Sequence, residues 1–194
     1  FPSWDCLPYD RLSPNTNIVV ERMKTLNSLL NCQDKKRKII LTTINAIIQK
    51  SVPLQFVSKN NIILNKGQSI SQEKVLEVLS DYGFSRQPFV STVGEFSIRG
   101  GIIDIFSPFA ENPVRLDFFG DKIDEIKFFD KDSQISSKKI NKMKIFPFKE
   151  IILNNTSVKL FRKEYRKAFG ALNYDDPLYQ SISEGRNYIG YEHW

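Results

Sequence analysis

The stretch from Gly94 to Asp130, GEFSIRGGIIDIFSPFAENPVRLDFFGDKIDEIKFFD, limits the possible folds of this chain more than any other. It contains three runs rich in Phe, Ile, Val and Leu, which are Glu95 to Phe106, Val114 to Phe119 and Ile123 to Phe129. Such residues favour pleated, half-buried strands. Turn-forming residues separate the runs, namely Ser107-Pro108, Glu111-Asn112-Pro113 and Gly120-Asp121. The pattern predicts a three-stranded antiparallel meander.

The second run alternates sharply between apolar and polar side chains. Because successive side chains of a strand point to opposite faces, one face carries the apolar set, Val114, Leu116 and Phe118. We expect this face to meet a core. The other face then shows an arginine, an aspartate and a large aromatic ring to water, namely Arg115, Asp117 and Phe119.

The first run places Arg99 on the polar face, and the glycine pair Gly100-Gly101 then interrupts its register. We expect a β-bulge at these glycines. If the meander forms, Arg99 and Arg115 lie close together on its outer face, with Phe119 beside them. An exposed cluster of arginine and aromatic side chains has the composition of a protein-binding hot spot.

A second interpretation of these residues is structural. Arg99, Arg115 and Asp117 can be ordinary cross-strand charge partners, and Phe119 can be the edge of the core. Single exposed apolar groups are normal on protein surfaces. The residues alone leave both interpretations open.

The segments GEFSIRGGIIDIF and PVRLDFFGDKIDEIKFFD resemble the second domain of the bacterial transcription-repair coupling factor family, Mfd. That domain is similar to domain 2 of the excision-repair protein UvrB, and in both families it docks UvrA. The match also includes FPSWDCLPYDRLSP at the start of the chain and extends to Trp194, but it is weak between Cys32 and Ser91.

The resemblance implies three UvrA-binding residues. The arginine of the RGG turn is Arg99, the arginine that opens RLDFF is Arg115, and the last phenylalanine of that motif is Phe119. We expect alanine at Arg115 or Phe119 to weaken UvrA binding by ~2 kcal/mol or more, as at hot spots. We also expect both variants to keep their melting temperature, since both side chains are predicted to point away from the core.

The residues before the meander are predicted to form the last part of a RecA-like α/β fold. The expected elements are a helix from Asn17 to Leu30 capped by Thr16 or Asn17, a buried strand from Ile39 to Thr42, and a helix from Thr43 to about Lys50. Phe1, Trp4 and Tyr9 are expected to anchor the extended segment from Phe1 to Pro14. We assign residues 1–60 to a partial, degenerate domain 1A.

Residues 61–148 are assigned to domain 2, the UvrA-binding module of α+β type. A strand is expected from Ile62 to Leu64, and a helix that begins after Ser71 and ends at Gly83 is expected to cover the apolar face of the meander. We assign residues 149–194 to a partial domain 1B. It is expected to hold a helix from Thr156 to Phe169 and another from Pro177 to Ser183.

The chemistry of an enzyme or metal site is missing from the sequence. It has no GxxxxGK[ST] motif for ATP phosphates, and His193 is the one histidine beside two cysteines, Cys6 and Cys32. We therefore predict no catalytic residue, no metal and no cofactor in this chain, no small-molecule substrate, and reduced cysteines. No run approaches ~18 apolar residues, so no membrane span is expected, and the predicted location is the cytoplasm.

Taken together, these patterns predict a fragment of a coupling factor that recruits UvrA to stalled RNA polymerase. By resemblance, the parent is an ATP-driven translocase on double-stranded DNA that uses ATP and Mg²⁺. One alternative is a fragment of UvrB, although the aromatic DNA-gripping hairpin of UvrB is missing. Another is a basic DNA-binding domain, which a net charge of +6 permits. DNA affinity that falls steeply with salt and ignores Arg115 would favour the last alternative.

Overall fold

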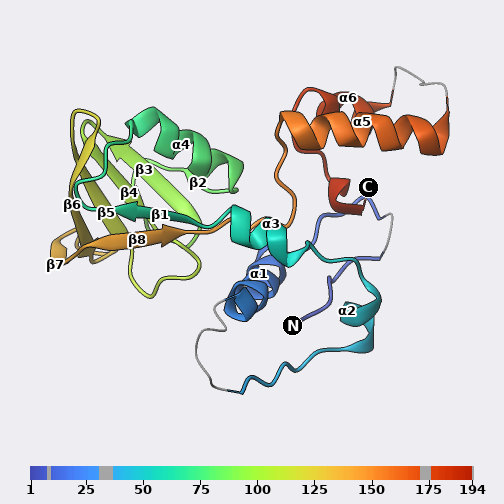
Figure 1. Cartoon of the computed structure of the whole chain (residues 1–194), viewed down its shortest axis with the longest axis horizontal. Helices are drawn as coiled ribbons and strands as arrows, with labels where there is room; N and C mark the ends of the chain where they lie inside the picture. Colours follow the sequence, from blue (N-terminus) through green and yellow to red (C-terminus); the bar gives the residue numbers. More distant parts are fainter. Residues whose placement is uncertain (8–9, 31–36, 171–175, 194) are drawn as a thin grey trace. The chain divides into compact units, whose positions relative to one another are not determined.

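The computed structural model describes residues 1–7, 10–30, 37–170 and 176–193 of the 194-residue chain. The chain forms two compact units (Figure 1). One consists of Phe1–Thr25, Lys35–Val52 and Glu150–Trp194, and the other of Leu26–Asp34 and Pro53–Lys149. Helices and strands occur together, which confirms the predicted mixed α/β and α+β class. The division into three family domains stays a prediction.

The second unit is built on a six-stranded sheet with the order β2-β3-β4-β5-β6-β7. Only β2 and β3 run parallel, and every other neighbouring pair is antiparallel. The strands are β2 (Ser85–Arg86), β3 (Glu95–Arg99), β4 (Ile102–Ile105), β5 (Val114–Phe119), β6 (Lys122–Phe129) and β7 (Ser136–Ile140). The predicted three strands are therefore too few, because the first run is two strands, and β2 and β7 were not expected.

Gly100 and Gly101 form the two-residue turn of the β3–β4 hairpin, and the prediction of a bulge there is wrong. Arg99 pairs with Ile102 directly across this turn, and Gly100 has a φ of 57°. Glycine reaches that conformation without steric cost. The register shifts instead between β5 and β6 after Asp117, and again between β6 and β7 after Lys127. The first of these shifts is the one that concerns Ile123. It turns Ile123 onto the apolar side of the sheet, where it is fully buried.

The apolar face of the sheet forms the core of this unit. Its buried side chains include Phe96, Ile103, Ile105, Val114, Leu116 and Ile126. The helix α4 (Gln72–Asp81) contributes buried Val75 and Leu79, and the ribbon of β1 (Ile62–Asn65) and β8 (Lys142–Ile145) contributes Leu64, Met143 and Ile145 (Figure 1). The strand predicted at Ile62 is confirmed. The predicted helix is confirmed as α4. The Ser71 side chain caps it by accepting a hydrogen bond from the Lys74 backbone, and Gly83 follows its end with a φ of 97°.

The regular elements in the described part of residues 1–60 are three helices, α1 (Thr16–Leu30), α2 (Ile44–Ile48) and α3 (Leu54–Lys59). Both predicted helices exist, although Asn15 caps α1 in place of Thr16 or Asn17. The strand predicted from Ile39 to Thr42 is wrong, since this segment is irregular and Ile39 is 90% exposed. A strand needs a neighbour to complete its ladder, and no described strand pairs with it.

Two antiparallel helices complete the first unit, α5 (Asn155–Phe169) and α6 (Pro177–Ser183), followed by a short 3₁₀ turn, η1 (Tyr191–His193). Both helices match the predicted ranges to within one residue. Asn154 and Ser157 close a capping box at the start of α5, and Asp176 caps α6. The α6 residues Leu178 and Ile182 form a core with Tyr191, against which Phe161 of α5 packs.

A buried ion pair holds the first residues of the chain in this unit. Arg22 of α1 has no exposed surface, and its guanidinium donates to both carboxylate oxygens of Glu150, at 2.5 and 3.3 Å. It also donates to the carbonyl of Pro2 and lies 4.4 Å from the centre of the Phe1 ring. The Trp4 indole donates to Glu150 as well, at 3.0 Å. Phe1 and Trp4 are therefore anchors, as predicted, while Tyr9 lies outside the described residues.

We expect Glu150→Gln to lower the free energy of unfolding by ~3 kcal/mol or more. Removing one partner of a buried ion pair leaves the other charge buried without compensation. Urea unfolding followed by tryptophan fluorescence measures the loss. Glu184→Gln is the matched control, because the ion pair of Glu184 with Arg186 is exposed and should contribute little. Equal unfolding midpoints for the two variants would contradict the prediction.

Candidate functional site

The candidate site is the polar face of the sheet, opposite the core. Residues that pair directly across antiparallel strands lie on the same face. Asp104 of β4 pairs with both Ser97 and Arg115, and Ile102 pairs with both Arg99 and Asp117. The structure therefore brings Arg99 and Arg115 together on one face, as predicted.

Asp104 holds both arginines. Its side chain has no exposed surface. The Arg115 guanidinium donates to it through Nε and Nη2, at 2.7 and 2.9 Å, and Arg99 donates through Nη2 at 2.6 Å. Charge-assisted bonds of this bidentate kind fix orientation as well as distance. One buried carboxylate thus sets the positions of two guanidinium groups.

The prediction that Arg115 is exposed to water is wrong, because its side chain is only 13% exposed. Besides Asp104, it donates to the Gln134 carbonyl at 3.2 Å and to the Ser136 hydroxyl at 3.1 Å, and it lies 4.7 Å from the centre of the Phe129 ring. The hydrogen bond with Asp104 raises the pKa of the guanidinium, which stays charged. The exposure on which the expected tolerance of Arg115→Ala rested is therefore contradicted.

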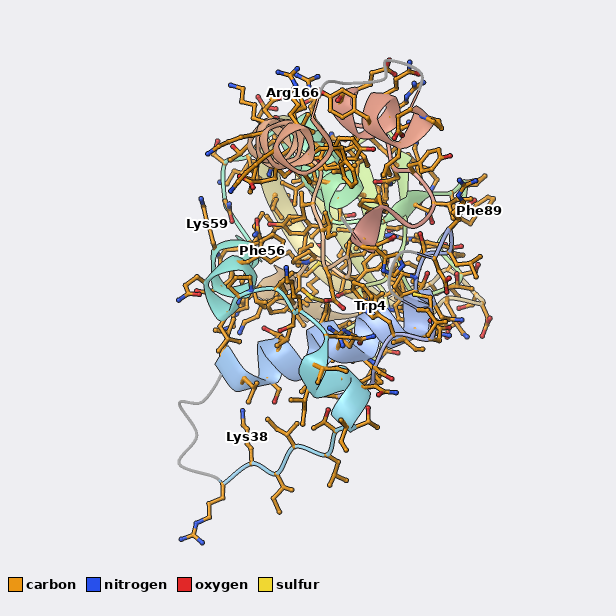
Figure 2. The ribbon with its side chains drawn as sticks, turned by 90° about the vertical axis from the view of Figure 1, so that its right-hand side faces the viewer. Trp4, Lys38, Phe56, Lys59, Phe89 and Arg166 are labelled. Carbon is orange, nitrogen blue, oxygen red and sulfur yellow. The ribbon has the colours of Figure 1, made fainter. Side chains whose placement is uncertain are left out.

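Arg99 is more accessible, and Phe89 lies beside it. The Arg99 side chain is 39% exposed, and its guanidinium lies 5.3 Å from the centre of the Phe89 ring. Phe89 is 59% exposed and projects outward in Figure 2. The segment after Phe89 is fixed by Glu95, which accepts hydrogen bonds from the backbone of Ser91 and Thr92. An exposed cation and an exposed ring therefore form one preorganised pair.

Phe119 is the most exposed member of the site, at 83%. It ends β5 beside the turn at Gly120, and strand alternation places it on the same face as Arg115. The Phe118 backbone donates to the Gly101 carbonyl at 2.7 Å, which joins this turn to the Gly100-Gly101 turn after Arg99. Phe119 and Arg99 therefore lie at the same end of the sheet. The interpretation of Phe119 as the edge of the core is excluded.

A ladder of ion pairs adjoins the arginines. Lys127 binds Asp117 at 2.7 Å and Glu125 at 2.6 Å, and Lys139 also binds Glu125. Hydrogen bonds from Lys127 and Lys139 lower the pKa of Glu125 to about 2. Asp117 therefore partners a lysine and not an arginine.

Sequence reasoning missed two residues of this face, Asp104 and Phe89. Asp104 carries a usable signal, because an aspartate inside the apolar run IIDIF must be paired if the strand is buried. A turn at Gly100-Gly101 would also have placed it opposite Ser97 and beside Arg99. Phe89 follows a proline in an irregular segment, and no periodicity marks it.

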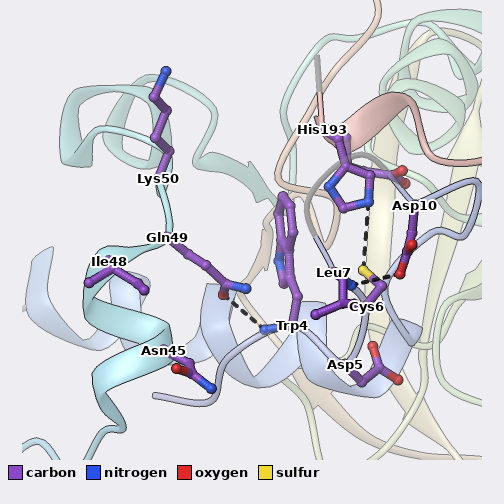
Figure 3. Close-up of a pocket in the computed structure, with 11 residues that line it drawn as sticks. Trp4, Asp5, Cys6, Leu7, Asp10, Asn45, Ile48, Gln49, Lys50 and His193 are labelled. Carbon is purple, nitrogen blue, oxygen red and sulfur yellow. Dashed lines mark hydrogen bonds between the residues drawn. The ribbon is translucent and has the colours of Figure 1, made fainter.

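The first unit contains a separate pocket of about 870 Å³ (Figure 3). Trp4, Cys6, Gln49 and His193 line it, together with the acidic side chains of Asp5, Asp10 and Glu192. The backbone of Trp4 donates to Gln49 at 3.0 Å, and the Trp4 ring packs edge-on against His193.

The cysteine and histidine in this pocket are not arranged as a nucleophile and its base. Burial raises the pKa of the Cys6 thiol, and nearby Asp5 and Asp10 raise it further, so the reactive thiolate is disfavoured. The His193 Nε2 atom lies 3.7 Å from the Cys6 sulfur but also 3.2 Å from the Leu12 carbonyl, which can only accept a hydrogen bond. In the tautomer that donates to Leu12, Nε2 carries a proton and cannot take the one from the thiol.

The described residues hold neither a cluster of metal ligands nor a helix suited to cross a membrane. Within 1–7, 10–30, 37–170 and 176–193, no three acidic, histidine or cysteine side chains gather as a metal site. No helix in those ranges has the length and apolar character needed to cross a bilayer. Cys32 lies outside them.

Comparison with known proteins agrees with the resemblance seen in the sequence. Residues 62–151 match the family model described as the UvrB interaction domain. Proteins named transcription-repair-coupling factor are similar along the chain. That of Rickettsia bellii is 36% identical over 99% of the chain, that of Haemophilus influenzae 33% over 100%, and that of Escherichia coli 31% over 98%.

The chain spans only about a sixth of the length of these relatives, since it covers 16–17% of each. The matched domain includes the whole polar face from Arg99 to Phe119. The predicted recognition is thereby confirmed: residues 62–151 match the UvrB interaction domain, and 98–100% of the chain is similar to proteins named transcription-repair-coupling factor.

Proposed function

We propose that this chain binds UvrA through a docking surface made of Phe89, Arg99, Arg115 and Phe119. The observation that carries the proposal is the 83% exposure of Phe119 at the same end of the sheet as the partly exposed Arg99. Aromatic rings and arginines are the side chains that most often dominate binding energy at protein interfaces. The name of the matched domain, UvrB interaction domain, supports a protein partner.

The four residues have different roles in this proposal. Phe119 and Phe89 offer apolar area, and Arg99 offers charge and hydrogen bonds at their side. Arg115 is largely buried and shapes the surface mainly through Asp104, so it acts as a positioning residue. Because Asp104 holds both guanidiniums before binding, little side-chain entropy is lost when the partner arrives.

The wider role is proposed from the family. We infer that the parent protein is a cytoplasmic, ATP- and Mg²⁺-dependent translocase on double-stranded DNA, which meets stalled RNA polymerase and recruits UvrA for excision repair. The relatives named transcription-repair-coupling factor support this role over that of a UvrB fragment. ATP chemistry would reside in parts of the parent other than this chain.

We expect Phe119→Ala to weaken UvrA binding by ~30-fold, which corresponds to ~2 kcal/mol, without changing the melting temperature. The ring is exposed, so its removal costs no core packing. Titration calorimetry against purified UvrA measures the affinity, and circular dichroism checks folding. Leu160→Ala is the matched control, because Leu160 is 59% exposed on α5 and outside the docking surface. Undiminished UvrA binding by Phe119→Ala would falsify the proposal.

Arg115→Ala should lose both stability and UvrA binding, in contrast to Phe119→Ala. It leaves the buried Asp104 carboxylate with Arg99 alone, and we expect a loss of ~3 kcal/mol in unfolding free energy. Arg115→Lys should lie between this variant and wild type, since an ammonium cannot bond in a bidentate manner. Urea titration measures the effect. An unchanged midpoint for Arg115→Ala would show that its bonds to Asp104 contribute nothing.

Phe89→Ala should weaken UvrA binding by ~5-fold and leave stability unchanged. Loss of the ring removes exposed apolar area and a cation–π partner of Arg99, a contact of ~0.5–1 kcal/mol at such sites. Phe89→Tyr keeps the ring and is expected to bind as wild type does. If alanine and tyrosine at this position bind equally well, Phe89 is not part of the docking surface.

A further inference from the structure

The helix α5 carries a continuous basic face. It has five cations and one acidic residue in the sequence NTSVKLFRKEYRKAF. At 100° per residue, all five cations fall within an arc of about 140°. They are Lys159, Arg162, Lys163, Arg166 and Lys167, and every one is exposed. No apolar side chain interrupts the arc, and Figure 2 shows Arg166 pointing outward from the helix.

Among the residues that the structure describes, no acidic side chain pairs with these cations. None of the five forms an ion pair with a carboxylate of the described residues. Some exposed lysines elsewhere in the described chain are paired, as Lys24 is with Glu21 and Lys74 with Glu77, while single lysines such as Lys138 form no ion pair there; the α5 face differs in gathering five cations on one side of one helix. The α5 face is therefore a concentration of uncompensated positive charge.

The helix dipole explains only part of this face. Cations in the last turn are favoured by the negative end of the dipole, which accounts for Arg166 and Lys167. That effect falls off within one turn. Lys159, Arg162 and Lys163 lie before the last turn. The amphipathic pattern of α5 explains why polar residues gather on its solvent side, but not why their charges are nearly all of one sign.

The face is held firmly by α6. Arg162 donates to the Ser183 carbonyl at 2.5 Å, and Arg166 donates to the Tyr179 hydroxyl at 3.2 Å. The Tyr165 hydroxyl binds Asp176, the residue that caps α6. The two guanidiniums are thereby fixed at one edge of the arc, and the three lysines project freely along about 12 Å of helix.

We propose that the basic face of α5 binds the phosphate backbone of duplex DNA without reading its sequence. Charge complementarity favours DNA as the partner, because five positive charges on one face match a regular polyanion. Lysine is depleted in the cores of protein–protein interfaces, where aromatic anchors are enriched. A face made of lysine, arginine and small polar side chains, with no ring inside it, fits phosphates better than a protein. This site is separate from the docking surface for UvrA.

The test measures the anisotropy of a short fluorescein-labelled duplex titrated with the full 194-residue chain over a series of salt concentrations. Replacing the lysines together, as Lys159→Glu, Lys163→Glu and Lys167→Glu, should lower the affinity at least ~10-fold. It should also reduce the slope of log K against log salt by about 2 to 3, since three phosphate contacts are lost. The matching Lys→Gln triple variant, which is milder for folding, should reduce the slope similarly.

The control reverses three exposed lysines of the other unit, as Lys138→Glu, Lys142→Glu and Lys144→Glu, so that the net charge changes equally. It should keep most of the affinity, and the α5 variants should still bind UvrA. The proposal is overturned if the unaltered chain does not bind DNA at low salt, or if the α5 and control variants lose affinity equally. It is also overturned if poly-glutamate competes as well as unlabelled duplex does, because the face would then select acidic protein.

Discussion

The bond network of a single buried carboxylate, Asp104, is the constraint on which the polar face of the sheet depends. A carboxylate with no exposed surface must be compensated, because an unpaired buried charge is very costly. Arg115 and Arg99 together supply that compensation. The strands β3, β4 and β5 must therefore keep their register, since a slip of one residue would move Asp104 to the apolar face.

The pairing with Asp104 distinguishes Arg115 from Phe119, although the sequence pattern predicts that both side chains are exposed. Arg115 is largely buried against Asp104, Gln134 and Phe129, so it belongs to the structure of the sheet as well as to the docking surface. Phe119 is exposed, and no packing role accounts for it. In the proposed UvrA contact, exposed groups such as Phe119 would therefore supply the binding energy, and the buried charges of Asp104 and Arg115 would hold the surface in place.

Local patterns predicted much of this fold. Alternation predicted β5 with both ends correct, and strand parity predicted that Arg99, Arg115 and Phe119 share one face. Capping residues predicted the starts of α4 and α6, and the apolar stripe predicted α5. The failures concern pairing partners. Ile39 to Thr42 has the composition of a strand, but strand formation depends on a neighbour that a sequence window does not contain. Phe89 is placed by the irregular segment before β3, which has no period to read.

A double-mutant cycle between Asp104 and Arg115 tests most directly whether the buried carboxylate organises the polar face. Unfolding free energies would be measured in urea for wild type, Asp104→Asn, Arg115→Met and the double variant. If the buried carboxylate organises the face, the two substitutions are coupled by ~2 kcal/mol or more. The double variant then loses less unfolding free energy than the sum of the two single losses. Additivity within ~0.5 kcal/mol would contradict the account, because the two side chains would then contribute independently.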